Sequence, residues 1–233
     1  MTDQVFTIGS GRNGTKSMAV VLGAAFKKSF HEYKMIPQER RRVFFNPKWM
    51  GPKFKNKVAQ YKKFRQFHDA DNCNTYFIHH LCKIFPDAKV LLPVGSVFSF
   101  VRAHRVWGIF GPNDSNIHSR AYPKDDKEWN RRPIVVKLAW LWGIRNTQAI
   151  KRADKKRLMV FKTSDIHKRL DDIFKFIDKP ITDKAVDLAK CKHNKLSWPE
   201  ASIKLAESEI NHYLPEIDKI VRPFRSFLSG WLK

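Results

Sequence analysis

Hydrophobic and polar positions along the chain follow two alternating patterns. The apolar run Val5 to Ile8 is rich in β-branched and aromatic residues and stops at Gly9, which predicts a short buried strand. Apolar residues then recur at every third or fourth position over residues 15–26, which predicts an amphipathic helix. The chain is therefore expected to open with a strand, a glycine-containing turn and a helix.

The same two patterns recur further along the chain. Within the helix predicted at 134–151, Arg145 falls on the same side as Leu138 and Trp142. Strands that alternate with helices predict an α/β fold, here a single domain over residues 1–233 with a mostly parallel central sheet flanked by helices. The further strands are predicted at 89–94 and 157–162, and the further helices at 76–84, 134–151, 166–177 and 215–231, the last kinked at Pro223.

Two stretches interrupt these patterns. Residues 34–68 are punctuated by prolines, so we expect an irregular insertion there with short helical pieces. Residues 111–133 form a polar stretch that is too long for an ordinary connection, and we expect a binding loop or lid.

Charge changes this picture, because the 233 residues include 45 Lys or Arg and only 22 Asp or Glu, a formal net charge of +23. Such a balance implies an anionic partner: a nucleotide, a polyanion, a nucleic acid or an acidic lipid surface. Residues 27–65 carry thirteen Lys or Arg and two Glu, interleaved with aromatic residues. This basic stretch could bind phosphates and stack on rings, or it could be a solvated face around a small aromatic core. Contact with nucleic acid or a membrane surface through it is open but not required.

Other compositional features narrow the class of protein. With 42% hydrophobic and 13% aromatic residues, the chain is expected to be globular. It has no run of about 18 apolar residues, the length of a membrane span, and no secretory pattern at its start, so we expect a cytoplasmic protein. Cys73, Cys82 and Cys191 have neither metal-ligand spacing nor an even number, which predicts free thiols and no metal site.

The stretch GSGRNGTKSM follows the first predicted strand and combines glycines with an arginine and a lysine. Small residues between a strand and a helix let backbone N–H groups close around an anion, and the helix N-terminus adds positive potential. The stretch does not fit the nucleoside-triphosphate motif GxxxxGK[ST], because Thr15 stands where that motif has its lysine. It fits the dinucleotide motif poorly, because no acidic residue ends a second predicted strand about 20 residues later.

This stretch resembles the phosphosulfate-binding loop of sulfotransferases, which use 3′-phosphoadenosine 5′-phosphosulfate (PAPS) as sulfuryl donor. Three downstream segments resemble the same family in the same order: NTYFIHHLCKIFPDAKVLL, KLAWLWGIRNTQAI and RLMVFKTSDI. The resemblance covers most of the chain. It implies a sulfotransferase-like P-loop fold and transfer of a sulfuryl group to a hydroxyl or amine of an unidentified acceptor, which could be a carbohydrate or an anionic molecule. PAPS is the implied co-substrate, and no metal is implied.

The resemblance also assigns roles within the loop. Arg12 stands where the family has a catalytic cation that contacts the bridging oxygen and the sulfonate. Positive charge and fixed donors suit this chemistry, because negative charge develops on the equatorial and leaving oxygens in the transition state. The alternative is a tight glycine turn with incidental charge. The residues implied to bind the 5′-phosphosulfate are Gly11, Arg12, Asn13, Gly14, Thr15, Lys16 and Ser17.

Sulfuryl transfer also requires a base for the acceptor's proton. His31 and Glu32 follow the first predicted helix, where the resemblance implies a His or Glu on the acceptor side. We favour Glu32, because it is one of only two acids in the basic stretch, although it could equally balance neighbouring lysines. His31 is the second candidate, since its unperturbed pKa suits general-base catalysis.

The implied 3′-phosphate site departs from the family pattern. Gly95 and Ala103 stand where the family has the Arg and Ser that clamp this phosphate. Pro93 also interrupts a strand expected to be central, where a missing N–H donor is poorly tolerated. Nearby residues that could replace the clamp are Ser99, Arg102 and Arg105, and weaker candidates near the C-terminal end are His193, Asn194 and Lys195.

The missing clamp leaves a second hypothesis open: a catalytically weakened relative that binds a phosphorylated ligand or a polyanion without transfer. A third is a P-loop kinase-like phosphotransferase. Thr15 disfavours it, as does the lack of a metal-binding acid after a second predicted strand.

Overall fold

The computed structural model describes residues 4–10, 14–33, 48–110, 131–191 and 198–232, together with Glu39, Arg42, Val43, Asn46 and Trp129. Its five-stranded sheet has the order β2-β3-β1-β4-β5, and every neighbouring pair is parallel. The predicted α/β fold with a parallel central sheet is therefore confirmed. The strands are β1 (Gln4–Thr7), β2 (Ser29–His31), β3 (Phe67–Ala70), β4 (Lys89–Val94) and β5 (Leu158–Lys162).

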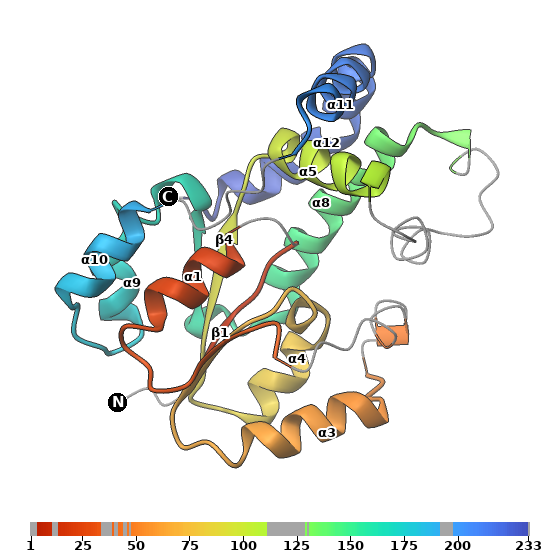
Figure 1. Cartoon of the computed structure of the whole chain (residues 1–233). Helices are drawn as coiled ribbons and strands as arrows, with labels where there is room; N and C mark the ends of the chain where they lie inside the picture. Colours follow the sequence, from red (N-terminus) through yellow and green to blue (C-terminus); the bar gives the residue numbers. More distant parts are fainter. Residues whose placement is uncertain are drawn as a thin grey trace.

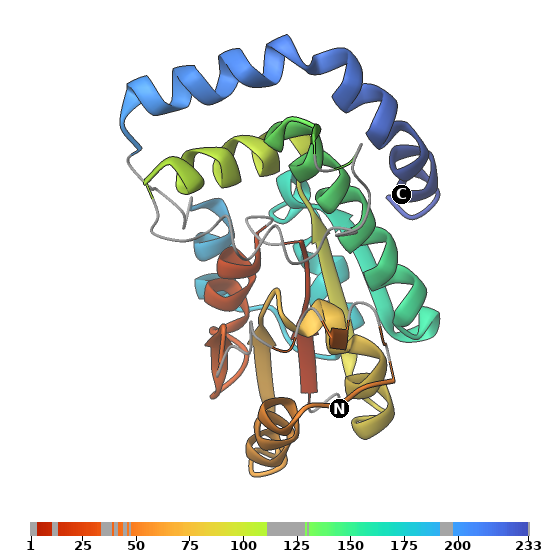
Figure 2. The same ribbon diagram turned by 90° about the vertical axis from the view of Figure 1, so that its right-hand side faces the viewer.

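Helices cover both faces of the sheet (Figure 1). One face carries α1 (Thr15–Leu22), α9 (Leu170–Phe176) and α10 (Asp183–Lys190), and the other carries α3 (Pro52–Tyr61), α4 (Asn74–Ile84) and α8 (Ile134–Arg152). The remaining helices are α5 (Val97–Phe110), α11 (Glu200–His212) and α12 (Leu214–Ser229). Figure 2 shows α11 and α12 running along the end of the molecule opposite α3, where α11 packs on α5 and α12 on α8.

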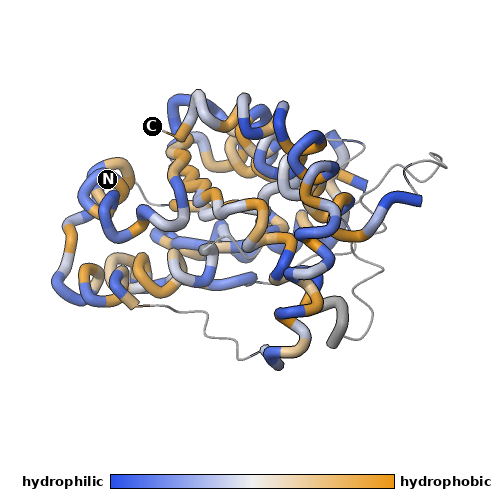
Figure 3. The backbone as a smooth tube through the Cα atoms, turned by 90° about the horizontal axis from the view of Figure 1, so that it is seen from above, coloured by the Kyte–Doolittle hydropathy of each residue, from blue (hydrophilic) through white to orange (hydrophobic). Residues whose placement is uncertain are grey.

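Alternate positions of β1 supply the two layers of the core. Phe6 and Ile8 are fully buried beneath α3, α4 and α8, whereas Val5 is fully buried on the side of α1 and α9. Because both faces are covered, the consecutive residues Val5 and Phe6 are both apolar instead of alternating with polar residues. The helices need only one apolar side each, and hydrophobic and hydrophilic segments alternate around them in Figure 3.

Pro93 lies within central strand β4 at a position where its missing N–H costs little. The Leu91 carbonyl accepts a hydrogen bond from the backbone N–H of Ile8, so Leu91 faces β1. Pro93, two residues later, faces the same side, but β1 has already ended at Thr7. Pro93 is paired only with Phe161 of β5, on its other side. The strand therefore keeps its ladder despite the proline.

Two strands lie where the sequence predicted an irregular insertion or no strand at all. The edge strand β2 and its neighbour β3 both precede β4, so the expectation that residues 89–94 form the second strand was wrong. Strand β3 was missed because two of its four residues, His68 and Asp69, are polar although they are fully buried. His68 bridges the hydroxyls of Thr7 and Ser29 on the two flanking strands, at 2.8 Å and 2.9 Å.

The predicted helices differ mainly at their ends. The helix expected at 15–26 ends at Leu22, where Gly23 begins a turn, and the one expected at 166–177 starts only at Leu170. Pro223 lies inside α12 as predicted. Helix α3 lies within residues 34–68, where short helical pieces were expected, whereas α5 and the short, largely polar α10 were not assigned from the sequence. No helix in the described part of the chain has the length and apolar character to cross a bilayer.

Candidate functional site

The strand order changes direction between β1 and β4, and in open α/β sheets this is where a crevice forms at the carboxyl ends of the strands. The chain leaves β1 toward β2 on one side, and it leaves β4 toward β5 on the other. In open α/β sheets, ligands bind at such a point, outside the carboxyl ends of the strands. The glycine loop after β1 and residues 95–96 after β4 flank this crevice.

Two helices, α4 and α8, hold the start of the glycine loop. The hydroxyl of Thr75, in the first turn of α4, accepts a hydrogen bond from the Gly9 N–H at 2.9 Å and donates one to the Gly9 carbonyl at 2.7 Å. The guanidinium of Arg145, on α8, donates to the Ser10 carbonyl at 2.7 Å. The indole of Trp142, one turn earlier on α8, donates to the Gly95 carbonyl at 3.0 Å. Helix α8 therefore contacts the backbone on both sides of the crevice.

Gly14, at the far end of the loop, is required for two independent reasons. Its φ is +87°, a conformation that residues with a Cβ rarely adopt. A Cβ at this position would also lie 2.8 Å from Cγ2 of Thr163, in the 3₁₀ turn that follows β5. Gly14 therefore packs closely against the turn at the end of β5.

The N-terminus of α1 is open to an anion. Gly14 occupies the N-cap and supplies no side-chain acceptor, so the cap leaves the first-turn N–H groups without a side-chain partner. Thr15 is buried, Ser17 is half-buried and Lys16 is exposed. Of the predicted phosphosulfate residues, the structure thus brings Gly14, Thr15, Lys16 and Ser17 to this edge of the sheet. Gly11, Arg12 and Asn13 lie outside the described residues.

The two candidate bases lie on the same edge, at the end of β2. His31 is exposed, whereas Glu32 is half-buried and accepts a hydrogen bond from the Asn72 amide at 3.3 Å. The backbone of Glu32 has φ 58°, and its N–H donates to the Ala70 carbonyl. Only β3 separates β2 from β1, so these strand ends are about 10 Å apart.

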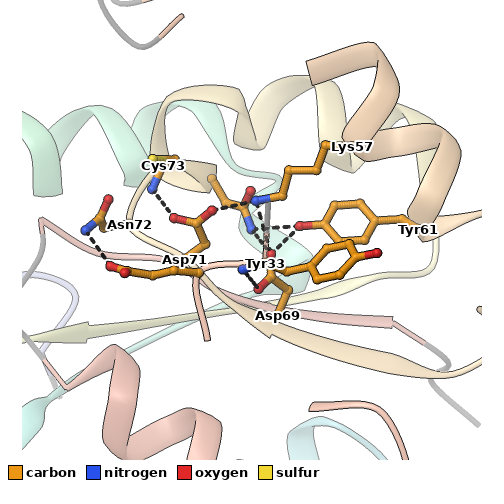
Figure 4. A network of polar contacts seen from close by, with 9 residues as sticks. Tyr33, Lys57, Tyr61, Asp69, Asp71, Asn72 and Cys73 are labelled. Carbon is orange, nitrogen blue, oxygen red and sulfur yellow. Dashed lines mark hydrogen bonds and ion pairs between the residues drawn. The ribbon is translucent and has the colours of Figure 1, made fainter. Parts of the chain in front are cut away.

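A buried ionic network lies beneath this edge (Figure 4). The ammonium of Lys57, on α3, contacts Asp71 at 2.5 Å and Asp69 at 3.3 Å, and all three side chains are fully buried. Tyr61 and Asn74 donate to the same oxygen of Asp69. Burial raises the pKa of Asp69, which Lys57 opposes. Burial alone would lower the pKa of Lys57, but Asp71 and Asp69 raise it.

This network bears on the kinase-like hypothesis, because it places two acids close to the glycine loop. Asp69 and Asp71 do lie in and just after β3, the strand beside β1, where a kinase-like enzyme could hold a metal ion. Both carboxylates already pair with Lys57. Among the described residues, no group of three or more His, Cys, Asp or Glu side chains is arranged to bind a metal. The arrangement therefore adds nothing to the kinase-like hypothesis.

The packing of α3 also indicates whether this part of the basic stretch 27–65 can stack on rings or is a solvated face around an aromatic core. Phe54 and Tyr61 are fully buried, and Tyr61 stacks on Phe67 with ring centroids 4.8 Å apart. These rings belong to the core and cannot stack on a nucleic-acid base. Lysines of the same helix, such as Lys53 and Lys55, are exposed. For α3, the packing supports the hypothesis of a solvated basic face around an aromatic core.

The candidates for the 3′-phosphate lie at the start of α5, directly after β4. Ser99 is exposed, and its backbone N–H donates to the hydroxyl of Ser96. Arg102 forms an ion pair with Glu207 of α11 at 2.7 Å, with about half of each side chain exposed. Arg105 pairs with Glu209. Ser99, Arg102 and Glu207 line a cavity of about 300 Å³. His193, Asn194 and Lys195 lie outside the described residues.

Sequence reasoning missed two residues that hold the loop, Thr75 and Arg145. Thr75 belonged to a segment recognised by resemblance, but no loop contact was expected of it. A signal for Arg145 did exist, since a cation on the same helix side as Leu138 and Trp142 is out of place unless it has a buried partner.

Comparison with known proteins agrees with this geometry. A family model described as a sulfotransferase domain matches residues 4–107, which include β1 to β4, the glycine loop and Glu32. A comparison with curated proteins gives no match.

Solved structures similar to this chain include one sulfotransferase and two sulfotransferase domains. The sulfotransferase domain from the curacin biosynthetic pathway has a TM-score of 0.49 and 11% identity, over 100% of this chain and 99% of that one. The sulfotransferase from Alicyclobacillus acidocaldarius has a TM-score of 0.48 and 13% identity, over 99% and 98%. The sulfotransferase domain from the Synechococcus PCC 7002 olefin synthase has a TM-score of 0.46 and 10% identity, over 89% and 94%. Residues 4–107, which are less than half of this chain, are therefore similar to a sulfotransferase domain.

Proposed function

We propose that this protein transfers a sulfuryl group from PAPS to a hydroxyl or amine of an acceptor molecule. The observation that carries the proposal is the uncapped N-terminus of α1, which follows the glycine loop at the crevice between β1 and β4. A phosphosulfate needs an environment of this kind, with fixed N–H donors and positive charge.

Residues of the glycine loop would stabilise the leaving group, and a residue after β2 would remove the acceptor's proton. The donor supplies an activated sulfur whose bond to the phosphate oxygen breaks as the acceptor oxygen or nitrogen bonds to sulfur. Backbone N–H groups of 14–17 and the charges of Arg12 and Lys16 would stabilise the leaving phosphate. Glu32 would take the acceptor's proton on its carboxylate, which Asn72 orients through Oε1. The products are the sulfated acceptor and adenosine 3′,5′-bisphosphate.

The acceptor would bind near Glu32, on the opposite side of β3 from the glycine loop. Its class remains a proposal drawn from charge: the formal net charge of +23 suits an anionic acceptor or a sulfatable carbohydrate. The exposed lysines of α3 could contribute to its capture.

A specific observation favours a second candidate function. Arg102, the proposed replacement for the missing clamp, is already paired with Glu207. A chain whose 3′-phosphate site is occupied in this way could bind a phosphorylated ligand without transferring sulfuryl groups.

Thermal unfolding with nucleotides tests the proposal. Adenosine 3′,5′-bisphosphate should raise the melting temperature more than ATP does, because a ligand that binds only the folded state stabilises it. Arg12→Ala should abolish release of adenosine 3′,5′-bisphosphate from PAPS in the presence of an acceptor while the protein stays folded. Equal shifts with both nucleotides, or none with either, would count against a PAPS enzyme. Binding without turnover for a broad set of acceptors would favour the second candidate.

A further inference from the structure

Arg145 is a buried cation whose charge lacks a carboxylate partner among the described residues. Its side chain is 5% exposed, and its Nη1 donates to the Ser10 carbonyl. The guanidinium carbon lies 5.7 Å from the centre of the Tyr76 ring. Its Nε is buried without a hydrogen-bond partner. A carbonyl and a ring face compensate a buried positive charge only in part.

The charge of Arg145 lies beside the glycine loop. Ser10 is the last described residue before the stretch 11–13, and Gly14 begins the helix that is open to an anion. The same carbonyl that Arg145 holds therefore belongs to the loop that would surround the ligand. A positive charge fixed behind such a loop favours an anion in front of it, and the low local dielectric strengthens the attraction.

We propose that Arg145 is a positioning residue of the anion loop, and that its buried charge is compensated only when an anionic ligand occupies the loop. Arg145 holds the Ser10 carbonyl at the start of the loop, and its charge adds to the affinity for an anion at the N-terminus of α1 without direct contact. This inference rests on the proposed function for the identity of the ligand, but not for the presence of an anion.

Removing the Arg145 charge is expected to affect anion affinity and the stability of the ligand-free protein differently. Removing the charge should weaken anion binding, whereas it should not destabilise the ligand-free protein, because an uncompensated buried charge is itself unfavourable. A purely structural Arg145 would behave in the reverse way. Loss of its hydrogen bond would lower the melting temperature of the free protein and leave the affinity of the folded fraction unchanged.

Three variants separate these cases. Arg145→Gln keeps a donor for Ser10 without the charge, and Arg145→Lys keeps the charge without the planar fork. Arg152→Gln is the matched control. It lies two turns further along α8 and donates to the Tyr76 carbonyl at 3.5 Å, so it also contacts Tyr76 but lies at the other end of the helix.

Calorimetric titration with adenosine 3′,5′-bisphosphate and thermal unfolding of the free proteins provide the readouts. We expect Arg145→Gln to weaken binding about 10-fold or more, as for a lost charged partner in a low-dielectric site, with no fall in the melting temperature. Arg145→Lys should retain most of the affinity, and Arg152→Gln should bind like the wild type. Unchanged affinity in Arg145→Gln would overturn the inference, and so would a failure of that variant to fold.

A second probe separates this inference from the proposed function. Inorganic sulfate, at constant ionic strength, should stabilise the wild type against heat more than it stabilises Arg145→Gln. If the nucleotide does not bind but this difference is found, the proposed donor is wrong and the role of Arg145 stands. If the nucleotide binds and neither probe distinguishes the variants, the role of Arg145 is wrong and the donor stands. If neither ligand stabilises the wild type, both are wrong.

Discussion

The backbone of Glu32 is strained at the position where a base is needed. Among described residues with a side chain, only Glu32 and Asp178 have positive φ. Such a conformation costs of order 1–3 kcal/mol and persists where the surroundings impose it. Here the bond from the Glu32 N–H to Ala70 and the contact with Asn72 fix both backbone and carboxylate. The strain supports a functional role for Glu32 more strongly than for exposed His31.

Glu32→Gln tests that role. The substitution keeps the side-chain volume and can still bond to Asn72, but it removes the basic carboxylate. We expect the turnover of PAPS with an acceptor to fall by roughly 100-fold or more, with the affinity for adenosine 3′,5′-bisphosphate nearly unchanged. His31→Gln is the control and should retain activity. The opposite result, an active Glu32→Gln and an inactive His31→Gln, would assign the base to His31.

His68 makes stability depend on pH. Burial, and secondarily the charge of His31, lower the pKa of His68 from 6.5 to about 3. The folded protein therefore keeps His68 neutral, while the unfolded chain takes up a proton below pH 6.5. The free energy of unfolding should fall by about 1.4 kcal/mol per pH unit from this residue as the pH drops from 6.5 toward 3.

Urea unfolding of the wild type and His68→Gln between pH 7 and pH 4.5 measures this effect. Gln can still bond to Thr7 and Ser29 but does not titrate. The difference in unfolding free energy between the two proteins should therefore narrow steadily below pH 6.5. A difference that does not change with pH would show that His68 titrates normally in the folded protein.

At the scale of elements, hydropathy predicted those whose burial pattern is simple. Strand β4 is apolar after Lys89, helix α8 has apolar residues at helical spacing, and both were predicted within a residue of their observed ends. Strand β3 escaped because buried polar residues in it are neutralised by partners from other elements. Its Asp69 depends on Lys57 and Tyr61, which only the tertiary fold brings close.

In the candidate site too, residues that are contiguous in sequence could be predicted, whereas residues that act through tertiary contacts could not. Residues 14–17 could be predicted because the loop and the following helix N-terminus are contiguous in sequence. The loop contacts of Thr75 and Arg145 could not be predicted, since they depend on how α4 and α8 pack against Gly9 and Ser10, although the helix side on which Arg145 lies indicated a buried partner. A single sequence carries no record of such contacts.

We expect Lys57 to contribute to the free energy of unfolding by holding α3 against the sheet. Lys57→Met leaves Asp69 and Asp71 buried without a cation, so we expect a loss of about 3–5 kcal/mol in unfolding free energy by urea denaturation. Lys55→Met, an exposed position on the same helix, should change stability very little. Adding Asp71→Asn to Lys57→Met should restore part of the loss. A stable Lys57→Met protein would mean that the carboxylates are protonated or hydrated.

At the scale of the whole molecule, α11 closes over α5 through the pairs Arg102–Glu207 and Arg105–Glu209. The first pair is about half exposed, and such pairs contribute only about 0–1 kcal/mol to stability. Arg102 is therefore available to exchange Glu207 for a phosphate. This exchange would couple the C-terminal helices to the donor site.

Arg102→Ala tests the exchange. Charged hydrogen bonds are worth about 1.5–3 kcal/mol, so the variant should bind adenosine 3′,5′-bisphosphate roughly 10-fold or more weakly by calorimetry. Binding of adenosine 5′-phosphosulfate, which lacks the 3′-phosphate, should barely change. Glu207→Ala, which frees Arg102, should bind the bisphosphate at least as well as the wild type. Equal weakening toward both ligands would make Arg102 a structural residue. Failure of the wild type to distinguish them would favour the weakened relative.

The central place of β1 has a consequence for how the chain folds. Gln4 pairs with Phe67 and Val5 with Lys89, so both neighbours of this strand lie far along the sequence. Contacts this distant form late, because a long segment of chain must be closed before they are gained. At synthesis rates of about 5–20 residues per second, several seconds pass between the synthesis of β1 and that of β4. Until β3 is made, the strand that carries the core residues Val5 and Phe6 has no partner on either edge, so the nascent chain exposes apolar surface that the folded protein buries.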